Sequence, residues 1–436
     1  MVRQQDATSE ILARETLVIA PTLARYTQIV AEYGQGSYIY ARDGRKYLDF
    51  AMGIATNNVG HCHPRVVQAA VEQTKKLIHG AASVVHYEQH VELAEKLVEI
   101  TPPGIDMCFF ANSGAEAVEG AVKLARYVSG RPIIISFIGG FHGRTYGAVS
   151  LTSSKAHYRA GYQPLMPSFH AAPYPYCYRC PMGQKRESCA VDCLSYLDRM
   201  LETVTPASDV AAVIIEPLLG EGGYVVPPRE YLVGLRQLCD EHGILLILDE
   251  VQSGFGRTGK MFAAEHFEVN PDIVSLGKGI ASGFPLSAVV ASSSLMRAWP
   301  AGVHGSTFGG NPVAVAAALA SIAVIQEEGL LENAVRMGDR IVTRLRELKD
   351  QHASLGDVRG LGLMIGVEFD REDGSPNKEA VARIREQCLE KGLILLSCGT
   401  WENGIRIVPP LNVSEAEVDE GLGIFEAALQ ALQGRD

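Results

Sequence analysis

Two stretches of this chain decide its fold: Ile244-Leu245-Leu246-Ile247-Leu248-Asp249-Glu250-Val251-Gln252 and Ile273-Val274-Ser275-Leu276-Gly277-Lys278-Gly279. Each begins with a short apolar run and leads to a charged residue, Asp249 in the first stretch and Lys278 in the second. Apolar runs without polar interruptions are typical of strands that are buried on both faces of a sheet. The two stretches therefore predict two buried strands, one ending in a carboxylate and the other in a lysine.

The alternation of strand and helix extends along the chain. Further patterns predict strands at 107–110, 133–137, 210–215 and 287–291, and helices at 115–128, 195–203 and 229–242. Helices between buried strands predict an α/β fold, in which a mostly parallel sheet is covered on both faces. Ligands of such sheets bind beyond the carboxyl ends of the strands, and Asn112, Glu216, Asp249 and Lys278 all fall at those ends.

A smaller α/β region follows residue 325. The patterns there predict helices at 333–352, 378–390 and 414–432 and strands at 361–369 and 393–396. At the other end of the chain they predict helices at 12–30, 64–77 and 88–99 and a hairpin at 38–50. We expect an N-terminal segment, 1–60, that joins the small lobe, a large domain, 61–325, with a loop insertion at 153–195, and a small C-terminal domain, 326–436.

Composition narrows the classes of protein to which the chain could belong. A net charge of -11 over 436 residues gives no basic footprint for a nucleic acid. Residues 1–30 lack the continuous apolar core of a secretory signal, and no run approaches the roughly 18 apolar residues of a membrane span. The nearest candidate, 313–324, is typical of a buried core helix. We therefore expect a cytoplasmic protein with neither a membrane nor a nucleic-acid partner.

Asp249 and Lys278 together suit pyridoxal phosphate chemistry. A lysine amine forms a Schiff base with the aldehyde of this cofactor, and a carboxylate keeps the pyridine nitrogen protonated so that the ring accepts electrons. A lone lysine after a strand is usually a solvated surface residue. Because one strand ends in a carboxylate and another in a lysine, the sequence instead predicts that pyridoxal 5'-phosphate is bound at Lys278.

The segments Leu248-Asp249-Glu250-Val251-Gln252 and Ser275-Leu276-Gly277-Lys278-Gly279 resemble the class III aminotransferases of fold-type I, and in particular the 4-aminobutyrate aminotransferases. The resemblance runs from about Tyr38 to the C-terminal helix, so it covers nearly the whole chain. It implies a large domain that binds pyridoxal phosphate beside a smaller α/β domain. It also implies a homodimer or higher homo-oligomer with shared active sites.

The resemblance assigns residues to the cofactor. Ser113 with Glu116 fits a capping box, which alone is usually structural, but in the family Ser113, Gly114 and Ala115 would hold the phosphate at a helix N-terminus. Thr307 would reach the phosphate of the partner subunit. The other residues implied around the cofactor are Phe141, stacked on the ring, His142 beside it, Val251 on the opposite face, Gln252 near the ring hydroxyl, and Glu216, which could equally be a capping acid.

Four residues are implied at the substrate. Arg144 would bind the distal carboxylate of an ω-amino acid, because a guanidinium holds a carboxylate through two N–H groups. Arg406 would bind the α-carboxylate of 2-oxoglutarate, and Glu221 would pair with Arg406 when no α-carboxylate is present. Ile54 would leave room for a linear chain. The implied reaction moves the amino group of 4-aminobutyrate to a 2-oxo acid, through a Schiff base at Lys278 and a pyridoxamine phosphate form.

Other interpretations stay open at this point. Ornithine, acetylornithine and broad ω-amine transaminases share the pattern. Some amino-acid racemases share it too, and they need the same Lys278 and Asp249. A non-catalytic protein on this fold is disfavoured because both residues are present. The preferred amino donor and acceptor are therefore left undecided between these enzymes.

Four cysteines are bunched in the predicted loop insertion. Their spacing could hold zinc or allow disulfides, although the gap between the two pairs is shorter than in common zinc ribbons. Free thiols in a surface loop are the favoured interpretation, and a structural role is expected in every case. The residues are Cys177, Cys180, Cys189 and Cys193.

Overall fold

Seven strands form the central sheet of the computed structural model, which describes residues 2–433. Within this sheet β10 runs antiparallel to both of its neighbours, whereas the pairs from β9 to β6 are parallel. The predicted mostly parallel sheet is confirmed, and β6 is a strand that the sequence analysis missed. The order across the sheet is β4 (Met107–Ala111), β10 (Ser287–Ala291), β9 (Ile273–Leu276), β8 (Leu245–Asp249), β7 (Val210–Ile215), β5 (Ile133–Phe137) and β6 (Phe169–Ala172).

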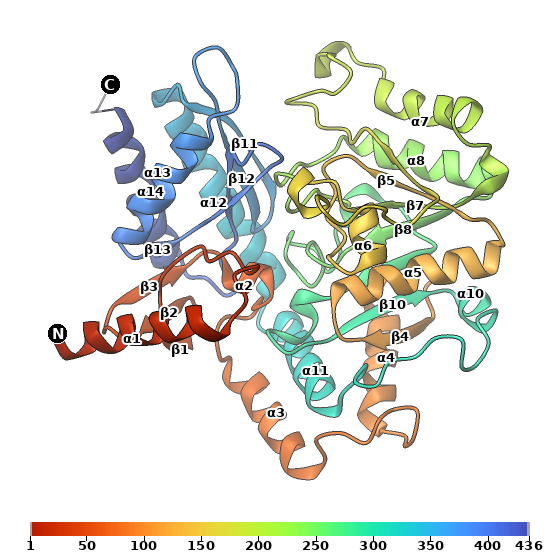
Figure 1. The fold of residues 1–436 in the computed structure, drawn as a ribbon, viewed down its shortest axis with the longest axis horizontal. Helices are drawn as coiled ribbons and strands as arrows, with labels where there is room; N and C mark the ends of the chain where they lie inside the picture. The colour runs from red at the N-terminus through yellow and green to blue at the C-terminus, as the bar shows by residue number, and fades with distance from the viewer. Residues whose placement is uncertain (1, 434–436) are drawn as a thin grey trace.

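Helices cover both faces of this sheet (Figure 1). Ile214 of β7 packs in one hydrophobic cluster with α5 (Gly114–Ser129), while the next residue, Ile215, packs in another with α8 (Arg229–His242). Successive side chains of a strand point to opposite faces, so an unbroken apolar run is what a doubly covered strand requires. Beside these helices lie α6 (Tyr146–Leu151), which contacts α5, and α7 (Asp192–Thr203) and α9 (Ala264–Phe267), which contact α8.

Two four-stranded sheets lie in the smaller lobe, on the left of Figure 1. In the first, β3 pairs in parallel with β13, with Leu48 opposite Leu393, so that N-terminal and C-terminal segments share one sheet. This pairing supports the proposal that residues 1–60 join the small lobe, although the domain boundaries stay predictions. The first sheet has the order β1 (Ala31–Gln35), β2 (Tyr38–Ala41), β3 (Lys46–Asp49) and β13 (Leu393–Ile394), and the second β11 (Leu355–Leu361), β12 (Met364–Phe369), β15 (Gly404–Ile407) and β14 (Leu396–Cys398).

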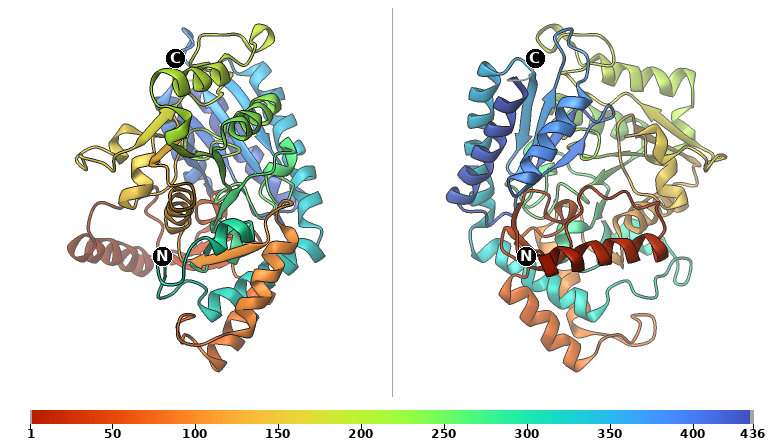
Figure 2. Two further views of the ribbon diagram at one scale, coloured as in Figure 1. Left: turned by 90° about the vertical axis from the view of Figure 1, so that its right-hand side faces the viewer. Right: turned by 60° about the vertical axis from the view of Figure 1, so that its left-hand side comes forward.

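The remaining helices complete the two lobes. Figures 1 and 2 show α1 along the outside of the molecule and α3, α4 and α11 together below the central sheet. In the described part of the chain no single helix is long and apolar enough to cross a membrane, and α11 with α12 would satisfy that test only as a pair bent by 66°. The bounds are α1 (Val2–Val18), α3 (Pro64–Lys76), α4 (Glu88–Ile100), α10 (Ser293–Arg297), α11 (Pro312–Glu327), α12 (Leu330–Gln351), α13 (Lys378–Glu390) and α14 (Glu415–Gln433).

Three predicted elements need correction. The predicted helix at 12–30 ends at Val18, because a proline at position 21 disfavours helical geometry in the residue before it. The predicted strand at 361–369 is the end of a hairpin, in which Gly362 with a φ of 51° turns the chain from β11 into β12. The predicted strand at 393–396 is divided between two sheets, because β13 pairs with β3 and β14 pairs with β15.

Candidate active site

Lys278 and Asp249 lie beyond neighbouring strands at the carboxyl edge of the central sheet. β8 and β9 are parallel, with Asp249 opposite Ser275. Lys278 opens a short 3-10 helix, Lys278–Ala281, and its φ of 44° turns the backbone away from the strand. Burial, and next the positive charge of Arg406, lower the pKa of the Lys278 ammonium to about 8. A substantial share of this amine is therefore neutral near pH 8, as a nucleophile must be.

His142 and Glu216 surround the Asp249 carboxylate. Nδ1 of His142 lies 2.8 Å from Oδ2 of Asp249, and both side chains are buried. Burial alone would lower the pKa of His142, but the hydrogen bond and attraction to Asp249 raise it. Burial raises the pKa of Glu216 to about 7, and its carboxylate accepts hydrogen bonds from the amides of Phe141 at 2.8 Å and Gly220 at 2.9 Å. Glu216 therefore joins two loops beside Asp249 and does not cap a helix.

The N-terminus of α5 lies beside the same strand ends. A Cβ atom on Gly114 would stand 2.7 Å from Cγ1 of Val251, so the close approach of Val251 requires glycine there. Oγ of Ser113 accepts a hydrogen bond from the Glu116 amide at 3.3 Å, which confirms the predicted cap. The amides of Gly114 and Ala115 have no carbonyl of the helix to bond, so they are available to an anion.

Phe141 and Gln252 are also positioned by direct contacts. The Phe141 ring stands edge-on to Tyr158, with centroids 5.7 Å apart. Oε1 of Gln252 accepts a hydrogen bond from the Tyr224 hydroxyl at 2.6 Å. Glu216 follows β7 and binds the Phe141 amide, while Val251 and Gln252 follow β8. Most residues predicted around the cofactor therefore lie at the carboxyl edge of the sheet. This edge combines the first-turn amides of a helix, a buried carboxylate and a buried amine, the groups that a pyridoxal phosphate site requires.

Arg406 and Glu221 form a buried ion pair. Nη1 of Arg406 lies 2.9 Å from Oε2 of Glu221, and their side chains are only 2% and 9% exposed. Burial alone would raise the pKa of Glu221, but Arg406 and then Lys155 hold it below its usual range. Among the described residues, the buried Nε of Arg406 has no hydrogen-bond partner, and Nη1 contacts Glu221 as an ion pair without a well-aligned hydrogen bond. An unused donor on a buried guanidinium fits a carboxylate ligand.

Lys155 and Tyr158 hold the other oxygen of Glu221. Nζ of Lys155 lies 3.1 Å from Oε1, and the Tyr158 hydroxyl donates a hydrogen bond to the same atom at 3.1 Å. The exposed Arg144 stacks on this tyrosine, with its guanidinium carbon 4.2 Å from the centre of the ring. Tyr158 therefore lies between the two groups that were predicted to recognise carboxylates, Arg144 on one side and the Glu221–Arg406 pair on the other.

Ile54 occupies a strained turn at the surface. It is 46% exposed and lies in α2 (Met52–Ala55), whose backbone is left-handed at Ile54, with a φ of 62°, and at Met52, with a φ of 44°. Such angles are unfavourable for a β-branched residue, so the surroundings must hold the turn. Oδ1 of Asp49 does so by accepting a hydrogen bond from the Met52 amide at 3.0 Å. Contact between Ile54 and a substrate stays a prediction.

Thr307 is exposed on a loop beside α5. The preceding residue, Ser306, accepts a hydrogen bond from Nδ2 of Asn112 at 2.9 Å, so this loop is tied to the start of the helix that should hold the phosphate. The next residue, Phe308, is 58% exposed. An exposed threonine is compatible with a role in a partner subunit, and that role stays a prediction.

The cysteine loop is separate from these residues. Its four thiols are free and line one small enclosed cavity of about 20 Å³. In the part of the chain that the structure describes, no three or more His, Cys, Asp or Glu side chains are placed to hold a metal ion. The zinc interpretation of Cys177, Cys180, Cys189 and Cys193 therefore gains no support, and their chemical state in solution stays a prediction.

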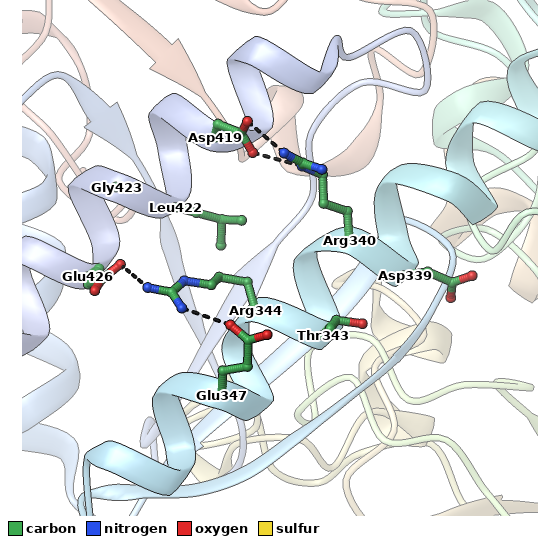
Figure 3. A pocket seen from close by; sticks show the side chains of 9 residues that line it. All are labelled: Asp339, Arg340, Thr343, Arg344, Glu347, Asp419, Leu422, Gly423 and Glu426. Carbon is green, nitrogen blue, oxygen red and sulfur yellow. Dashed lines mark hydrogen bonds and ion pairs between the residues drawn. The ribbon is translucent and has the colours of Figure 1, made fainter.

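A larger surface pocket, of about 600 Å³, lies between α12 and α14 (Figure 3). Its charged side chains already pair with one another, Arg340 with Asp419 at 2.8 Å and Arg344 with Glu426 at 2.7 Å. These pairs lie at the surface, where ion pairs contribute little. Volume alone therefore gives no reason to place an active site there.

Sequence reasoning missed several residues near Arg406. Lys155 and Tyr158 lie in the stretch 153–195, which was predicted only as a loop insertion. Tyr26 is close enough to Arg406 to interact electrostatically, and its segment was wrongly predicted as helix. Lysine and tyrosine are ordinary surface residues, so no local signal reveals that the fold buries or aligns them.

Comparison with known proteins finds relatives over nearly the whole chain. The family model described as aminotransferase class-III matches residues 20–429. A 5-aminovalerate aminotransferase of Pseudomonas putida is 42% identical, covering 96% of this chain and 98% of its own. A probable 4-aminobutyrate aminotransferase of Bacillus subtilis is 41% identical, covering 92% and 93%. An alanine/serine racemase of Pyrococcus horikoshii is 40% identical, covering 97% and 90%. A PLP-bound amine transaminase from an uncultivated Pseudomonas species has a TM-score of 0.89 at 30% identity, covering 95% of this chain and 98% of that one.

Proposed function

The chain belongs to the class III aminotransferases, pyridoxal phosphate enzymes of fold-type I, and we propose that it moves the amino group of an ω-amino acid to a 2-oxo acid. We further propose 4-aminobutyrate as the preferred donor and 2-oxoglutarate as the acceptor. Relatives named for 4-aminobutyrate and for 5-aminovalerate are 41% and 42% identical to this chain, so identity does not decide the length of the donor.

The observation that carries the proposal is the buried Glu221–Arg406 pair beside an exposed Arg144. A donor without an α-carboxylate leaves the pair closed, and its distal carboxylate can bind Arg144. An acceptor with an α-carboxylate can take the place of Glu221 on Arg406. The unpartnered Nε of the Arg406 guanidinium supports this exchange, because it leaves a donor for a carboxylate besides Nη1, which contacts Glu221.

The residues at the strand ends fit the cofactor, which when bound supplies an electron sink for the substrate. Lys278 would hold the cofactor covalently and, once released, move a proton from the amine-bearing carbon of the donor. Its lowered pKa supports this role, since a neutral amine can accept that proton. The residues that would hold the cofactor are Ser113, Gly114 and Ala115 at the phosphate, Asp249 at the ring nitrogen with His142 and Glu216 behind it, Phe141 and Val251 at the two ring faces, and Gln252 at the ring hydroxyl.

Substitution of Arg144 tests the proposed donor. In the Arg144→Ala variant, kcat/KM for 4-aminobutyrate should fall about 10- to 100-fold, the range expected when a charged hydrogen-bond partner is lost. The same value for butylamine, which has no carboxylate, should change little. Equal losses for both amines would show that Arg144 does not bind the donor. In the unaltered enzyme, a larger kcat/KM for 5-aminovalerate than for 4-aminobutyrate would show that the longer compound is the preferred donor.

Racemisation is a second candidate, favoured by the racemase of similar identity. A racemase would use Lys278 and Asp249 but return the proton to the substrate carbon. Incubation of the enzyme with L-alanine or L-leucine in deuterated water distinguishes the two functions. Formation of the D-enantiomer without any acceptor would establish racemisation, whereas amino transfer requires the 2-oxo acid for repeated turnover.

We propose that the active enzyme is a homodimer or a higher homo-oligomer in which Thr307 completes the site of the partner. Two apolar side chains support this proposal, because Phe308, which follows Thr307 in the chain, is 58% exposed and Ile78 is 59% exposed. Asn311 ties their two loops together by donating a hydrogen bond to the Ile78 carbonyl at 3.0 Å. The Thr307→Ala variant should sediment as the same oligomer as the unaltered enzyme. Its affinity for pyridoxal phosphate, measured separately, should be weaker. A cytoplasmic location stays a prediction from the sequence.

A further inference from the structure

We propose that Lys155, together with Tyr158, holds Glu221 while the α-carboxylate of an incoming 2-oxo acid occupies Arg406. The inference rests on the proposed function, because it concerns how one site accepts a donor without an α-carboxylate and an acceptor with one. Lys155 is then a positioning residue for the acceptor half of the reaction, and it acts through Glu221 rather than by touching the reacting atoms.

The exchange on Arg406 poses an electrostatic problem. Glu221 and Arg406 are both buried, so the arrival of a second carboxylate would leave Glu221 without its partner in a region of low dielectric constant. An unpaired buried charge is strongly unfavourable, and its free energy would oppose binding of the acceptor. Acceptor binding is therefore favourable only if Glu221 retains another partner after it leaves Arg406.

The second partner lies on the opposite oxygen of Glu221. Oε2 faces Arg406, whereas Oε1 is 3.1 Å from Nζ of Lys155 and accepts a hydrogen bond from the Tyr158 hydroxyl at 3.1 Å. The two sets of contacts use different atoms, so the contact with Arg406 can open while the other set remains. The Lys155 side chain is only 5% exposed, so water screens its charge weakly.

Charges of alternating sign continue from this site to the surface. Lys155 also lies 3.4 Å from Oε1 of Glu402, and the other oxygen of Glu402 pairs with the exposed Lys378. Glu402 thereby balances part of the charge of Lys155, so that Lys155 interacts with two carboxylates, Glu221 and Glu402. When a ligand carboxylate takes the place of Glu221 on Arg406, every buried charge in this row still has a neighbour of opposite sign.

This arrangement predicts a difference between the two substrates. A donor such as 4-aminobutyrate leaves the Glu221–Arg406 pair closed, so its reaction should depend little on Lys155. A ligand with a carboxylate at Arg406 opens the pair, so its affinity should depend on Lys155 strongly. The competing arrangement, in which Lys155 itself binds the distal carboxylate of the donor, predicts that the donor is weakened as well.

The test uses cofactor-loaded enzyme and glutarate, a dicarboxylate that has no amine or keto group and cannot react. Calorimetry gives its affinity, and single-turnover absorbance gives the apparent affinity and rate for 4-aminobutyrate. Lys155→Met removes the second partner of Glu221, and Lys155→Arg restores a positive charge. Lys378→Met is the matched control, because it removes a lysine that pairs with Glu402 but does not contact Glu221.

Lys155→Met should weaken glutarate at least about tenfold and leave 4-aminobutyrate within about threefold of the unaltered enzyme. The Lys155→Arg and Lys378→Met variants should stay close to the unaltered enzyme for both compounds. Undiminished glutarate binding by Lys155→Met, an equal loss for 4-aminobutyrate, or unaltered enzyme that does not bind glutarate would each overturn the inference. Lys155-dependent glutarate binding in an enzyme that does not convert 4-aminobutyrate would support the inference and overturn the proposed donor.

Discussion

Two clusters of ion pairs in this molecule have similar geometry and different surroundings. The Glu221–Arg406 contact of 2.9 Å joins side chains that are 9% and 2% exposed. The Arg340–Asp419 contact of 2.8 Å, in the pocket of Figure 3, joins side chains that are 40% and 51% exposed. Water and salt screen the exposed pair, whereas the buried pair retains most of its attraction. Distance alone therefore does not identify a functional charge, and burial must be considered with it.

The largest expected effect comes from the buried lysine at the strand end. Lys278→Ala should abolish turnover, because it removes both the covalent partner of the cofactor and the base. The protein should still fold, since alanine has no buried charge to stabilise. Steady-state assays and circular dichroism check the two halves of this prediction. Appreciable transamination by a folded Lys278→Ala protein would contradict the assigned role.

The buried pair should give the next largest effect. In Arg406→Met, the half-reaction with 2-oxoglutarate should weaken about 10- to 100-fold, as expected for loss of a charged hydrogen-bond donor. The half-reaction with 4-aminobutyrate should lose much less, because this donor has no carboxylate for Arg406. Single-turnover absorbance measures the two half-reactions separately. Losses of the same size in both would show that Arg406 stabilises the protein rather than binding the acceptor.

Buried charge should also be visible in the pH dependence of cofactor capture. Lys278 must be neutral to attack the aldehyde, and burial with the charge of Arg406 lowers its pKa to about 8. Deprotonation increases with pH, so the capture rate should rise about tenfold per unit below pH 8 and level off above it. Stopped-flow mixing of apoenzyme with pyridoxal phosphate measures this profile. A rate that continues to rise beyond pH 10 would indicate an ordinary, solvated lysine.

The exposed cluster should give the smallest effect. Arg340→Met removes one partner of Asp419, but the pair lies in water, and such pairs contribute little to stability. Activity and the midpoint of urea unfolding should both stay close to those of the unaltered enzyme. A clear loss of activity in Arg340→Met, with cofactor content unchanged, would mean that the surface pocket takes part in function.

The sequence predicted the parts of the molecule that depend on local pattern. The strands that end near Asp249 and Lys278 and the helix at 229–242 were predicted within a residue or two, because their apolar runs and periodicity are strong. The left-handed turn at Ile54 was not predicted, since its backbone is held by Asp49 rather than by a local preference. Lys155 was missed for a related reason: its partner Glu221 is distant in sequence, and only the fold brings them together.

The residues of the candidate site also fall into those that local sequence patterns indicate and those that only tertiary contacts reveal. Asp249 and Lys278 could be singled out because one ends a buried strand and the other follows one closely, and the resemblance to a family supplied Arg144, Glu221 and Arg406. The resemblance also implied the pairing of Glu221 with Arg406, but neither source indicated that the other oxygen of Glu221 would face Lys155. That information is in the tertiary contacts alone, so it required the structure.

The most direct test of the central claim is a half-reaction on cofactor-loaded enzyme, with 4-aminobutyrate added and no 2-oxo acid present. If the enzyme is a transaminase for ω-amino acids, the absorbance band of the lysine-linked cofactor should disappear, the band of its aminated form should replace it, and 2-oxoglutarate should then reverse the change. An unchanged spectrum with 4-aminobutyrate, together with exchange of the α-proton of an amino acid into deuterated water, would contradict amino transfer and identify a racemase.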